Sequence, residues 1–589
     1  MLAVLLRLPL LQLLWLASST APLMLPCVLA ADYQAPPRVH HHRPVQTFAF
    51  GSCHKNQYVV DEPDSAALWR TITERHKPEA FLWTGDTVYA PKRGVATIDE
   101  LALEYNVTSK LLVEAGLRDA DTTATATAAP KGSTNEKDDN ETSSLLLPMY
   151  GTWDDHDYGG NDMGKTMSQK DERRQLLLDF LDYSHWFPKE RRGMYHSVDF
   201  GIPPHQTKVI FLDTRWHRDD YRCVPTYLST DIPLGAGLAC IGRWLLAGLG
   251  LSVVCGPSQS STILGEEQWA WLGNEIKTSN AQLHVVVSSI QVLTTNPVVE
   301  SWGHFEHEQQ RLLNVLQTSR EKSPVSTVLL SGDVHHAEII SPRNKHAKAS
   351  SSSSSSSSSG ESLFEVTSSG LTHSCTKPFY GGLCGPLLRT FSTHRSPMDA
   401  YYIGRNYGTL EIDWDQGLYR VLVWSLENVA VNRDEANADE TQTYQNTEQQ
   451  QQQQQQQPVL QTEWTPIWGP DSQEQHIEWT TLPKVVDGHL IPHVRKLCIV
   501  ILILLLMISQ IYIWFILVPN SVRQHKRTRR NILEYDCDGE DDNDNYETDT
   551  TAGARGISSD KSGGDRGNLN GEERHGNRIG TVPIKPKTE

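Results

Sequence analysis

The chain has 589 residues and a formal net charge of −18 at pH 7, from 53 lysines and arginines against 71 aspartates and glutamates. This acidic balance argues against nucleic acid as the main partner, so no nucleic acid binding is expected. The nine cysteines are widely spread and contain no CxxC pair, which argues against a structural zinc site. The length could hold several domains, but long stretches do not have a globular composition.

The N-terminus, residues 1–30, has the pattern of a signal peptide. Arg7 precedes a nearly all-apolar run, Leu10–Leu16, and Val28–Ala30 offers the small-residue pattern of a cleavage site. An uncleaved anchor is the alternative. The pattern predicts that the chain enters the secretory route.

Residues 46–430 alternate between short apolar runs and helical patterns, which is the rhythm of an α/β domain. One helix is predicted over 64–76 with Asp64 as its N-cap, a second over 169–186, and a third that opens at Gly265 with acids in its first turn. The predicted strands are Gln46–Gly51, Ala80–Trp83, Lys208–Leu212, His284–Ser289, Ser326–Leu330, Leu363–Thr367, Thr409–Asp413 and Leu418–Trp424. The last two of these strands have a hairpin signal between them.

Three stretches of this domain have the composition of insertions. The first, 106–147, is rich in Thr, Ala, Asp, Asn and Ser and is expected to be a mobile surface segment. It contains sequons at Asn106 and Asn140, which predict glycosylation. The second, 221–260, holds three cysteines and an apolar patch too short for a membrane span, so a buried hairpin or helix is favoured over a membrane-dipping loop. The third, 343–361, contains a tract of serines.

Beyond residue 430 the globular pattern ends. A polar stalk with a glutamine tract is expected over 431–494, followed by an apolar run, 497–518, that is long enough for a transmembrane helix. The heavier basic flank follows this run, so the polar and disordered tail, 519–589, is expected in the cytosol. Together with the signal peptide, these segments predict a single-pass type I membrane protein. Its main domain would face the secretory-pathway lumen or the cell exterior.

The most unusual stretch is the acidic cluster Thr152–Asp162, which contains four carboxylates, a histidine and an amide. Carboxylate oxygens are preferred ligands of hard cations, although a solvated acidic turn is the alternative. Sites of open α/β proteins lie outside the carboxyl ends of strands, so loops that follow different strands can converge there. Polar clusters follow four apolar strands: Gly51-Ser52-Cys53, Gly85-Asp86-Thr87-Val88-Tyr89, Trp153-Asp154-Asp155-His156 and Gly332-Asp333-Val334-His335.

From about Thr47 to Ser425 this ordered set resembles the PhoD-like alkaline phosphatases, a branch of the calcineurin-like metallophosphoesterases. The resemblance implies an α/β fold, a four-layer αββα sandwich of two mixed sheets with helices on both outer faces. The residues that carry it are Phe50-Gly51-Ser52-Cys53, Gly85-Asp86-Thr87-Val88-Tyr89, Trp153-Asp154-Asp155-His156-Asp157, Leu212-Asp213-Thr214-Arg215, Leu264-Gly265-Glu266-Glu267-Gln268-Trp269 and Gly332-Asp333-Val334-His335.

The resemblance also implies a dinuclear or multinuclear metal centre, of Fe(III) with calcium, with zinc or manganese as alternatives. Asp86 would bridge two ions. Thiolate and phenolate suit iron, whereas carboxylates suit the harder ion. The implied metal ligands are Cys53, Asp86, Tyr89, Asp155, Asp333 and His335.

Several of these residues have other interpretations. Cys53 could be a buried thiol or half of a disulfide, Tyr89 could only pack under the site, and Asp154 is expected to hold its loop through hydrogen bonds. Among the remaining extracytosolic cysteines, Cys375–Cys384 is the preferred disulfide because it closes a short loop, and Cys223–Cys240 is the second choice. Spacing does not fix this connectivity.

The expected function is a membrane-anchored, extracytosolic phosphohydrolase. A metal-activated hydroxide would attack a phosphate monoester or diester in line, and His156 would protonate the leaving group. His156, Asp155 and Arg215 are the predicted catalytic residues, with Arg215 gripping a phosphate bidentately or, equally, bracing Asp213. The alternative function is a catalytically inert surface receptor or adhesion protein on the same fold.

Overall fold

The chain divides into two compact units, residues 1–506 and 507–589. The computed structural model describes residues 39–60, 62, 64–90, 94–120, 145–221, 238–239, 242–243, 257, 260–294, 296, 298–322, 325–341, 363–376, 381–390, 395, 400–426, 457–467 and 491–512. The predicted signal peptide, serine tract and cytosolic tail lie outside these described residues, as do Asn140, Cys223 and Cys240.

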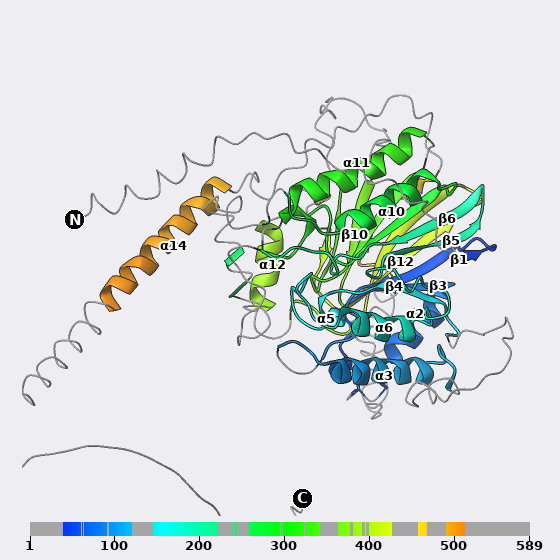
Figure 1. Cartoon of the computed structure of the whole chain (residues 1–589), viewed down its shortest axis with the longest axis horizontal. Helices are drawn as coiled ribbons and strands as arrows, with labels where there is room; N and C mark the ends of the chain where they lie inside the picture. The colour runs from blue at the N-terminus through cyan, green and yellow to red at the C-terminus, as the bar shows by residue number, and fades with distance from the viewer. Residues whose placement is uncertain are drawn as a thin grey trace, which may run out of the picture. The chain divides into compact units, whose positions relative to one another are not determined.

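Two mixed β-sheets form the core of the first unit (Figure 1), which confirms the predicted α/β class with two mixed sheets. The eight-stranded sheet has the order β1 (Val39–His41), β5 (His196–Ile202), β6 (His205–Phe211), β7 (Leu283–Ser288), β8 (Ser326–Ser331), β10 (Leu363–Ser368), β9 (Ala337–Ile340), β11 (Tyr401–Tyr402). The seven-stranded sheet has the order β14 (Leu460–Gln461), β13 (Leu418–Ser425), β12 (Asn406–Asp413), β2 (Thr47–Gly51), β3 (Ala80–Thr84), β4 (Met149–Thr152), and β15 (Thr465–Pro466) pairs with β13.

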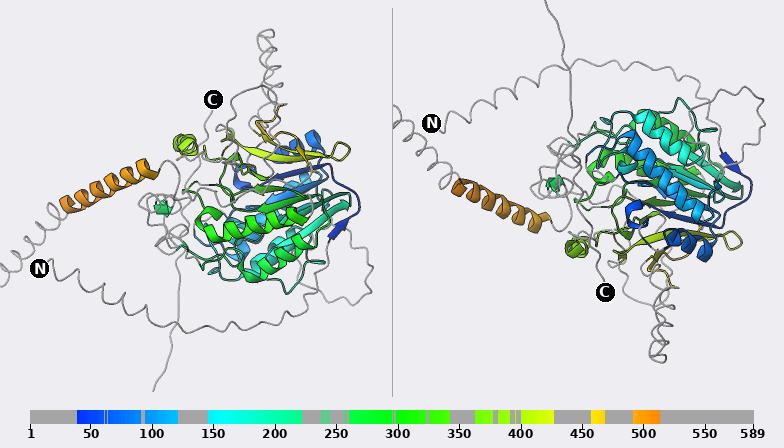
Figure 2. Two further views of the ribbon diagram at one scale, coloured as in Figure 1. Left: turned by 90° about the horizontal axis from the view of Figure 1, so that it is seen from above. Right: turned by 90° about the horizontal axis from the view of Figure 1, so that it is seen from below.

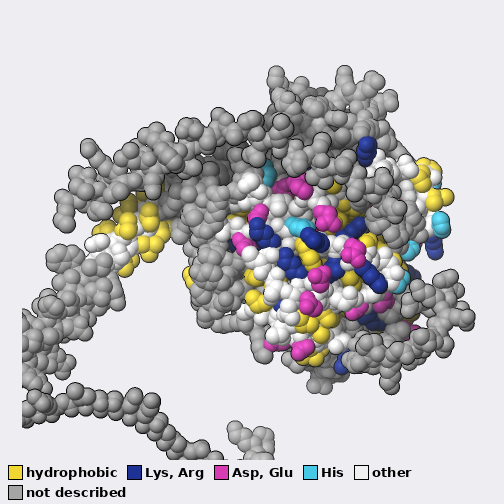
Figure 3. Space-filling view, in the orientation of Figure 1, with side chains coloured by type: hydrophobic (Ala, Val, Ile, Leu, Met, Phe, Trp, Pro, Cys, Tyr) yellow, Lys and Arg dark blue, Asp and Glu magenta, His cyan; other side chains and the backbone are white. Residues whose placement is uncertain are grey.

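Helices lie on both outer sides of the paired sheets. Figure 1 shows α10 and α11 on one side and α2, α3 and α6 on the other, and the two views of Figure 2 agree. The described helices are η1 (Asn56–Tyr58), α2 (Ala67–His76), α3 (Ile98–Glu114), α5 (Asp155–Tyr158), α6 (Lys170–Phe180), α10 (Gly265–Lys277), η2 (Trp302–His304), α11 (Glu306–Lys322), α12 (Gly381–Thr390) and α14 (Ile491–Tyr512). In the orientation of Figure 1, Figure 3 shows acidic, basic and histidine side chains interspersed on this face.

Alternate residues of the central strands belong to two different apolar layers, because successive side chains of a strand point to opposite faces. In β7, Val285 and Val287 pack in the cluster that contains the strands of the other sheet. Val286 instead packs with Leu272 of α10 and Leu312 of α11. Both faces of β7 are therefore covered by apolar residues, which explains why its centre is three consecutive valines, Val285–Val287, rather than an alternating pattern.

Helix α3 corrects the predicted start of the first insertion, since it contains Asn106 and runs to Glu114. The helix begins with a capping box, in which the Thr97 side chain accepts from the Glu100 backbone N–H and the Glu100 side chain accepts from Thr97. The composition concealed this helix because its solvent side is polar. Asn106 lies on that exposed side.

Residues 457–467 correct the predicted stalk, because they return to the seven-stranded sheet. Strands β14 and β15 both pair with β13, and Ile467 is fully buried. The hydroxyl of Ser326 donates to the Pro466 carbonyl at 2.7 Å, which ties this segment to the start of β8. Two-residue strands carry no periodic signal, so the sequence did not reveal them.

Helix α14 begins at Ile491, before the predicted transmembrane span of 497–518, and overlaps this span as far as Tyr512. Residues 513–518 of the predicted span lie outside the described residues. No helix in the described ranges is long and apolar enough to cross a membrane. Membrane attachment stays a prediction.

Candidate metal centre

The candidate site lies where parallel strands of the two sheets end. Cys53 follows β2, Asp86 and Tyr89 follow β3, and α5 begins at Asp155, shortly after β4. From the other sheet, the loop after β8 carries Asp333 and His335, and the segment after β10 runs beside it. The strand ends therefore bring together side chains that are far apart in the chain, such as Cys53 and Asp333, which are separated by 280 positions.

The six predicted metal ligands lie close together. Three groups of ligand atoms each fall within 4.8 Å of one another: Cys53, Asp86 and His335; Asp86, Asp155 and His156; Asp154, Asp155 and Asp333. Tyr89 joins the first group, because its hydroxyl donates to Asp86 Oδ2 and lies 3.2 Å from His335 Nε2. Asp86 belongs to two groups and Asp155 to two, so these carboxylates could bridge adjacent ions.

Four of these residues have a left-handed backbone, which is uncommon for residues other than glycine. The φ angles are 63° at Cys53, 50° at Asp86, 72° at Asp333 and 58° at His335. Such conformations cost free energy and persist where the surrounding structure enforces them, most often at functional sites. Their concentration around one cluster supports a functional role for it.

Gly85 lets the chain turn into the cluster directly before Asp86. Its φ is 102°, and a Cβ atom there would lie 2.6 Å from the Cβ of Asp154. Any side chain at this position would be strained by the backbone and would collide with the acidic loop. Glycine therefore allows the loops after β3 and β4 to approach each other closely.

The donor set fits a cation. Asp155 Oδ1 and Asp154 Oδ2 are buried and have no hydrogen-bond partner among the described residues. Burial and the charges of Asp155 and Asp154 raise the pKa of Asp86, and burial with the same two charges raises that of Asp333. A bound cation would relieve this repulsion between buried carboxylates.

The neutral donors fit as well. Cys53 is a free and buried thiol, which excludes the disulfide interpretation. Burial, followed by the charge of Asp86, raises its pKa. Burial lowers the pKa of His335 to about 4, so its imidazole is neutral at pH 7 and keeps a lone pair for a metal. Thiol, phenol and imidazole on one side and carboxylates on the other thus offer two different sets of donors to neighbouring ions.

His156 lies at the outer edge of the cluster, on the short helix α5. Its ring stacks on Tyr89 with 3.9 Å between ring centres, and its backbone N–H donates to Asp86 Oδ1 at 3.2 Å. The side chain is 29% exposed, and its Nε2 lies 4.0 Å from Asp155 Oδ1. A group in this position can reach both the solvent and a ligand in the site.

The guanidinium of Arg215 braces the acidic loop, whereas the sequence offered either a phosphate or Asp213 as its partner. Its guanidinium is fully buried and forms ion pairs with Asp154 at 2.5 Å and Glu300 at 2.8 Å. The carboxylate of Asp213 instead accepts backbone N–H groups, including those of Arg215 and Trp216. Asp154 holds its loop through this ion pair and a hydrogen bond from the Ser289 hydroxyl, so its expected loop-holding role agrees with the contacts.

The fourth acidic group, Asp155, Asp162 and Glu300, already has cationic partners. Arg243 pairs with Asp162 at 2.8 Å, and Arg218 pairs with Glu300 at 2.7 Å. These arginines offset the negative charge, so this group is less suited to a metal than the other three. Arg243 also shows that the second insertion contacts the acidic loop.

The sequence missed two residues that follow β10. Ser369 Oγ lies 3.0 Å from Cys53 Sγ and accepts from the His335 backbone N–H at 2.9 Å. The ring of His373 lies 4.4 Å from that of His335 and 5.2 Å from that of Tyr89. The strand before them was predicted, so applying the strand-end argument to it would have found both.

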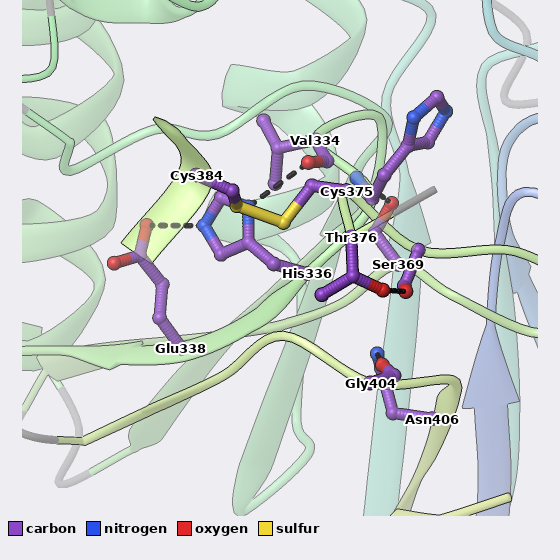
Figure 4. The surroundings of a disulfide bond; sticks show 11 residues. Val334, His336, Glu338, Ser369, Cys375, Thr376, Cys384, Gly404 and Asn406 are labelled. Carbon is purple, nitrogen blue, oxygen red and sulfur yellow. Dashed lines mark hydrogen bonds and ion pairs between the residues drawn. A yellow bond between two sulfur atoms is a disulfide. The ribbon is translucent and has the colours of Figure 1, made fainter. Parts of the chain in front are cut away.

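The disulfide between Cys375 and Cys384 confirms the preferred pairing. The Cys375 backbone N–H donates to the His335 carbonyl at 2.7 Å. Figure 4 shows the bond beside Val334 and His336, which flank that histidine in the chain. The disulfide thus joins helix α12 to the segment after β10, which is hydrogen-bonded to the loop that carries His335.

These features, two mixed sheets with carboxylate, thiol, phenol and imidazole groups gathered at their shared edge, define a metal-binding α/β protein. The family model described as PhoD-like phosphatase matches residues 48–421. The chain therefore belongs to the PhoD-like phosphatase family, as the sequence motifs indicated. This membership supports a metal-dependent phosphatase or phosphoesterase.

The solved structures that are similar to the chain include the two that follow. One is a structure of PhoD, with a TM-score of 0.39 and 16% identity over 66% of this chain and 67% of that one. The other is GAP50, described as the anchor in the inner membrane complex of Plasmodium, with a TM-score of 0.34 and 11% identity over 66% of this chain and 88% of that one. Comparison with curated proteins gave no match.

Proposed function

We propose that this chain is a membrane-anchored, extracytosolic phosphohydrolase that cleaves phosphate esters at a multinuclear metal centre. The observation that carries the proposal is the set of three adjoining ligand groups, in which Asp86 and Asp155 are shared. Shared carboxylates suit ions held close together, as in enzymes that clamp both the attacking and the leaving oxygen of a phosphoryl group. The family membership supports the same class of reaction.

The proposed ligand assignment follows the chemistry of the side chains. Cys53, Tyr89 and His335 with Asp86 would hold iron, and Asp155 and Asp333 with Asp86 would hold calcium. When bound, such ions polarise the phosphoryl group and supply a nucleophile from water at neutral pH.

The protein itself would keep these side chains in place before substrate arrives. Asp157 accepts the backbone N–H groups of Thr87 at 2.9 Å and Val88 at 3.1 Å, which holds the β3 loop against α5. Arg215 holds Asp154, so in this proposal it positions the acidic loop and does not touch phosphate. Such preorganisation lets the site stabilise the transition state without rearranging.

His156 is the proposed donor of the proton to the leaving oxygen, since it is partly exposed and borders the carboxylates. His156→Ala is expected to lower kcat about 10²-fold for an alkyl phosphate, whose leaving oxygen needs a proton. The loss should be below about tenfold for p-nitrophenyl phosphate, whose leaving group departs as an anion. His185→Ala, at an exposed histidine, is the control. Equal losses with both esters would contradict the role of His156.

Placement outside the cytosol is supported by the Cys375–Cys384 disulfide, because such bonds persist in oxidising compartments. The exposed Asn106 offers a test. A glycosidase-sensitive mass that disappears in Asn106→Gln, in protein from secretory cells, would support a luminal domain. If removal of both sequons leaves the mass and glycosidase response unchanged, the glycosylation prediction fails.

The function is tested by the metal content of the purified full-length protein, measured by mass spectrometry together with hydrolysis of an aryl phosphate monoester and diester. Iron and calcium with turnover are expected. Zinc or manganese with turnover would keep the activity but overturn the assigned metals. Protein without tightly bound metal and without turnover would overturn the proposal and favour the inert receptor.

A further inference from the structure

Lys55 is a half-buried lysine that the roles proposed above leave unused. Its ammonium lies 5.6 Å from the centre of the Tyr89 ring and 5.5 Å from that of Tyr58. The hydroxyl of the same Tyr89 contacts Asp86 and His335. Lys55 therefore places a positive charge beside the candidate metal centre without belonging to any of its ligand groups.

The ammonium of Lys55 forms no ion pair within the parts of the chain that the structure describes. Burial lowers its pKa, and the charge of Glu104 opposes this shift. The Glu104 carboxylate accepts a hydrogen bond from Asn56 Nδ2 at 2.7 Å. An ammonium that lies beside two aromatic rings and has no carboxylate partner gains a partner when an anionic ligand binds next to it.

The backbone around Lys55 is fixed by hydrogen bonds from two directions. The Lys55 backbone N–H donates to Thr372 Oγ1 at 2.7 Å, and that hydroxyl donates to the Cys53 carbonyl at 3.1 Å. The side-chain amide of the next residue, Asn56, donates through Nδ2 to the Glu104 backbone carbonyl of α3 at 2.9 Å. Little ordering of the backbone is then required when a ligand binds, which favours affinity.

The field of Lys55 reaches the centre itself. The rings of His156 and His373 lie next to the same Tyr89, with 3.9 Å and 5.2 Å between ring centres. A cation that disfavours positive charge on these rings favours negative charge in the space beside them. The charge of Lys55 therefore favours an anion in the part of the site that Tyr89, His156 and His373 border.

We propose that Lys55 is a substrate-binding residue that contacts a nonbridging phosphoryl oxygen and thereby makes phosphate monoesters the preferred substrate class. This inference rests on the proposed phosphohydrolase function. A phosphate monoester carries close to two negative charges above its second pKa of about 6, whereas a diester carries one. An additional cation beside the metal ions stabilises the second charge, so it contributes more to a monoester than to a diester.

The test compares full-length wild-type protein with Lys55→Met, Lys55→Arg and the control Lys277→Met, which replaces an exposed lysine of α10. Methionine keeps the aliphatic stem that packs on the rings and removes the charge. Lys55→Met is expected to raise KM for p-nitrophenyl phosphate at least about tenfold, the loss of one charge-assisted hydrogen bond. Values of kcat, metal content and KM for bis(p-nitrophenyl) phosphate should change less than about threefold, and Lys55→Arg should recover most of the loss.

Calorimetry with inorganic phosphate gives a readout that does not need turnover. Lys55→Met should weaken phosphate binding by the same factor of about ten, whereas Lys277→Met should bind as the wild type does. Equal phosphate affinity in wild type and Lys55→Met, absence of phosphate binding in both, or equal losses with monoester and diester would each overturn the inference. The proposed function fails separately, when the wild type holds no metal and cleaves neither ester.

Discussion

Replacing Asp86 with asparagine is expected to lower kcat/KM at least about 10³-fold and to deplete the bound metal, while the metal-free protein becomes more stable. Asp86 belongs to two of the ligand groups, so its charge contributes to both ions. Asparagine tolerates the left-handed φ of 50° found at this position better than most residues, so the backbone should be retained. Activity, metal content and urea unfolding of the full-length variant check the three parts.

The gain in stability follows from the raised pKa of Asp86, which is caused by burial and then by the charges of Asp155 and Asp154. A carboxyl whose folded-state pKa lies above its unfolded value of about 3.9 holds its proton more tightly when folded. Its contribution therefore destabilises the metal-free protein as the pH rises from about 4 towards neutrality. In Asp86→Asn this part of the pH dependence should be lost.

The control for Asp86→Asn is Asp415→Asn, at an exposed aspartate between β12 and β13. Its activity, metal content and unfolding midpoint should match those of the wild type. Asp86→Asn with full metal content and wild-type turnover would remove Asp86 from the centre. Equal stability of the two metal-free proteins would instead show that the cluster is not strained by its own charge.

The sequence predicted most of the site because one physical rule applies to it. Polar residues that follow parallel strands share one edge of a sheet, and this rule placed Cys53, Asp86, Asp155 and Asp333 together. The rule needs only local sequence, since each strand end is visible in its own apolar run. Only one strand of the β5–β6 hairpin was predicted. The sequence showed the second strand, but it did not show His196–Ile202, because polar residues interrupt the apolar pattern of that strand.

What the sequence could not predict depends on long-range partners. Glu300 pairs with Arg215 across 85 positions of the chain, and no local pattern marks either residue as the other's partner. The return of residues 457–467 to the sheet has the same cause, because its two-residue strands are stabilised by β13 and not by their own sequence. For this reason the sequence left the role of Arg215 ambiguous, whereas its burial between two carboxylates favours a role in holding the acidic loop.

Arg215→Met is expected to destabilise the folded protein by about 3–5 kcal/mol, the usual cost of removing one partner from a buried ion pair. Arg215 and both of its partners, Asp154 and Glu300, are at most 1% exposed, so neither carboxylate can turn to water. The shift in the urea unfolding midpoint at pH 7 measures this cost. A second variant that combines Arg215→Met with Asp154→Asn should regain much of the stability, since Glu300 keeps its ion pair with Arg218 at 2.7 Å and Asp154 no longer carries a buried charge.

Arg311→Met is the matched control, because Arg311 pairs with Glu266 on the surface, where these side chains are 40% and 80% exposed. Exposed pairs of this kind contribute about 0–1 kcal/mol, so the midpoint should barely move. If Arg215 gripped phosphate instead, Arg215→Met would raise KM for the ester while stability stayed within about 0.5 kcal/mol of the wild type. Bracing of the acidic loop thus predicts a change in stability, whereas a grip on phosphate predicts a change in KM. Burial of the guanidinium favours the first, because a phosphate cannot reach a side chain with no exposed surface.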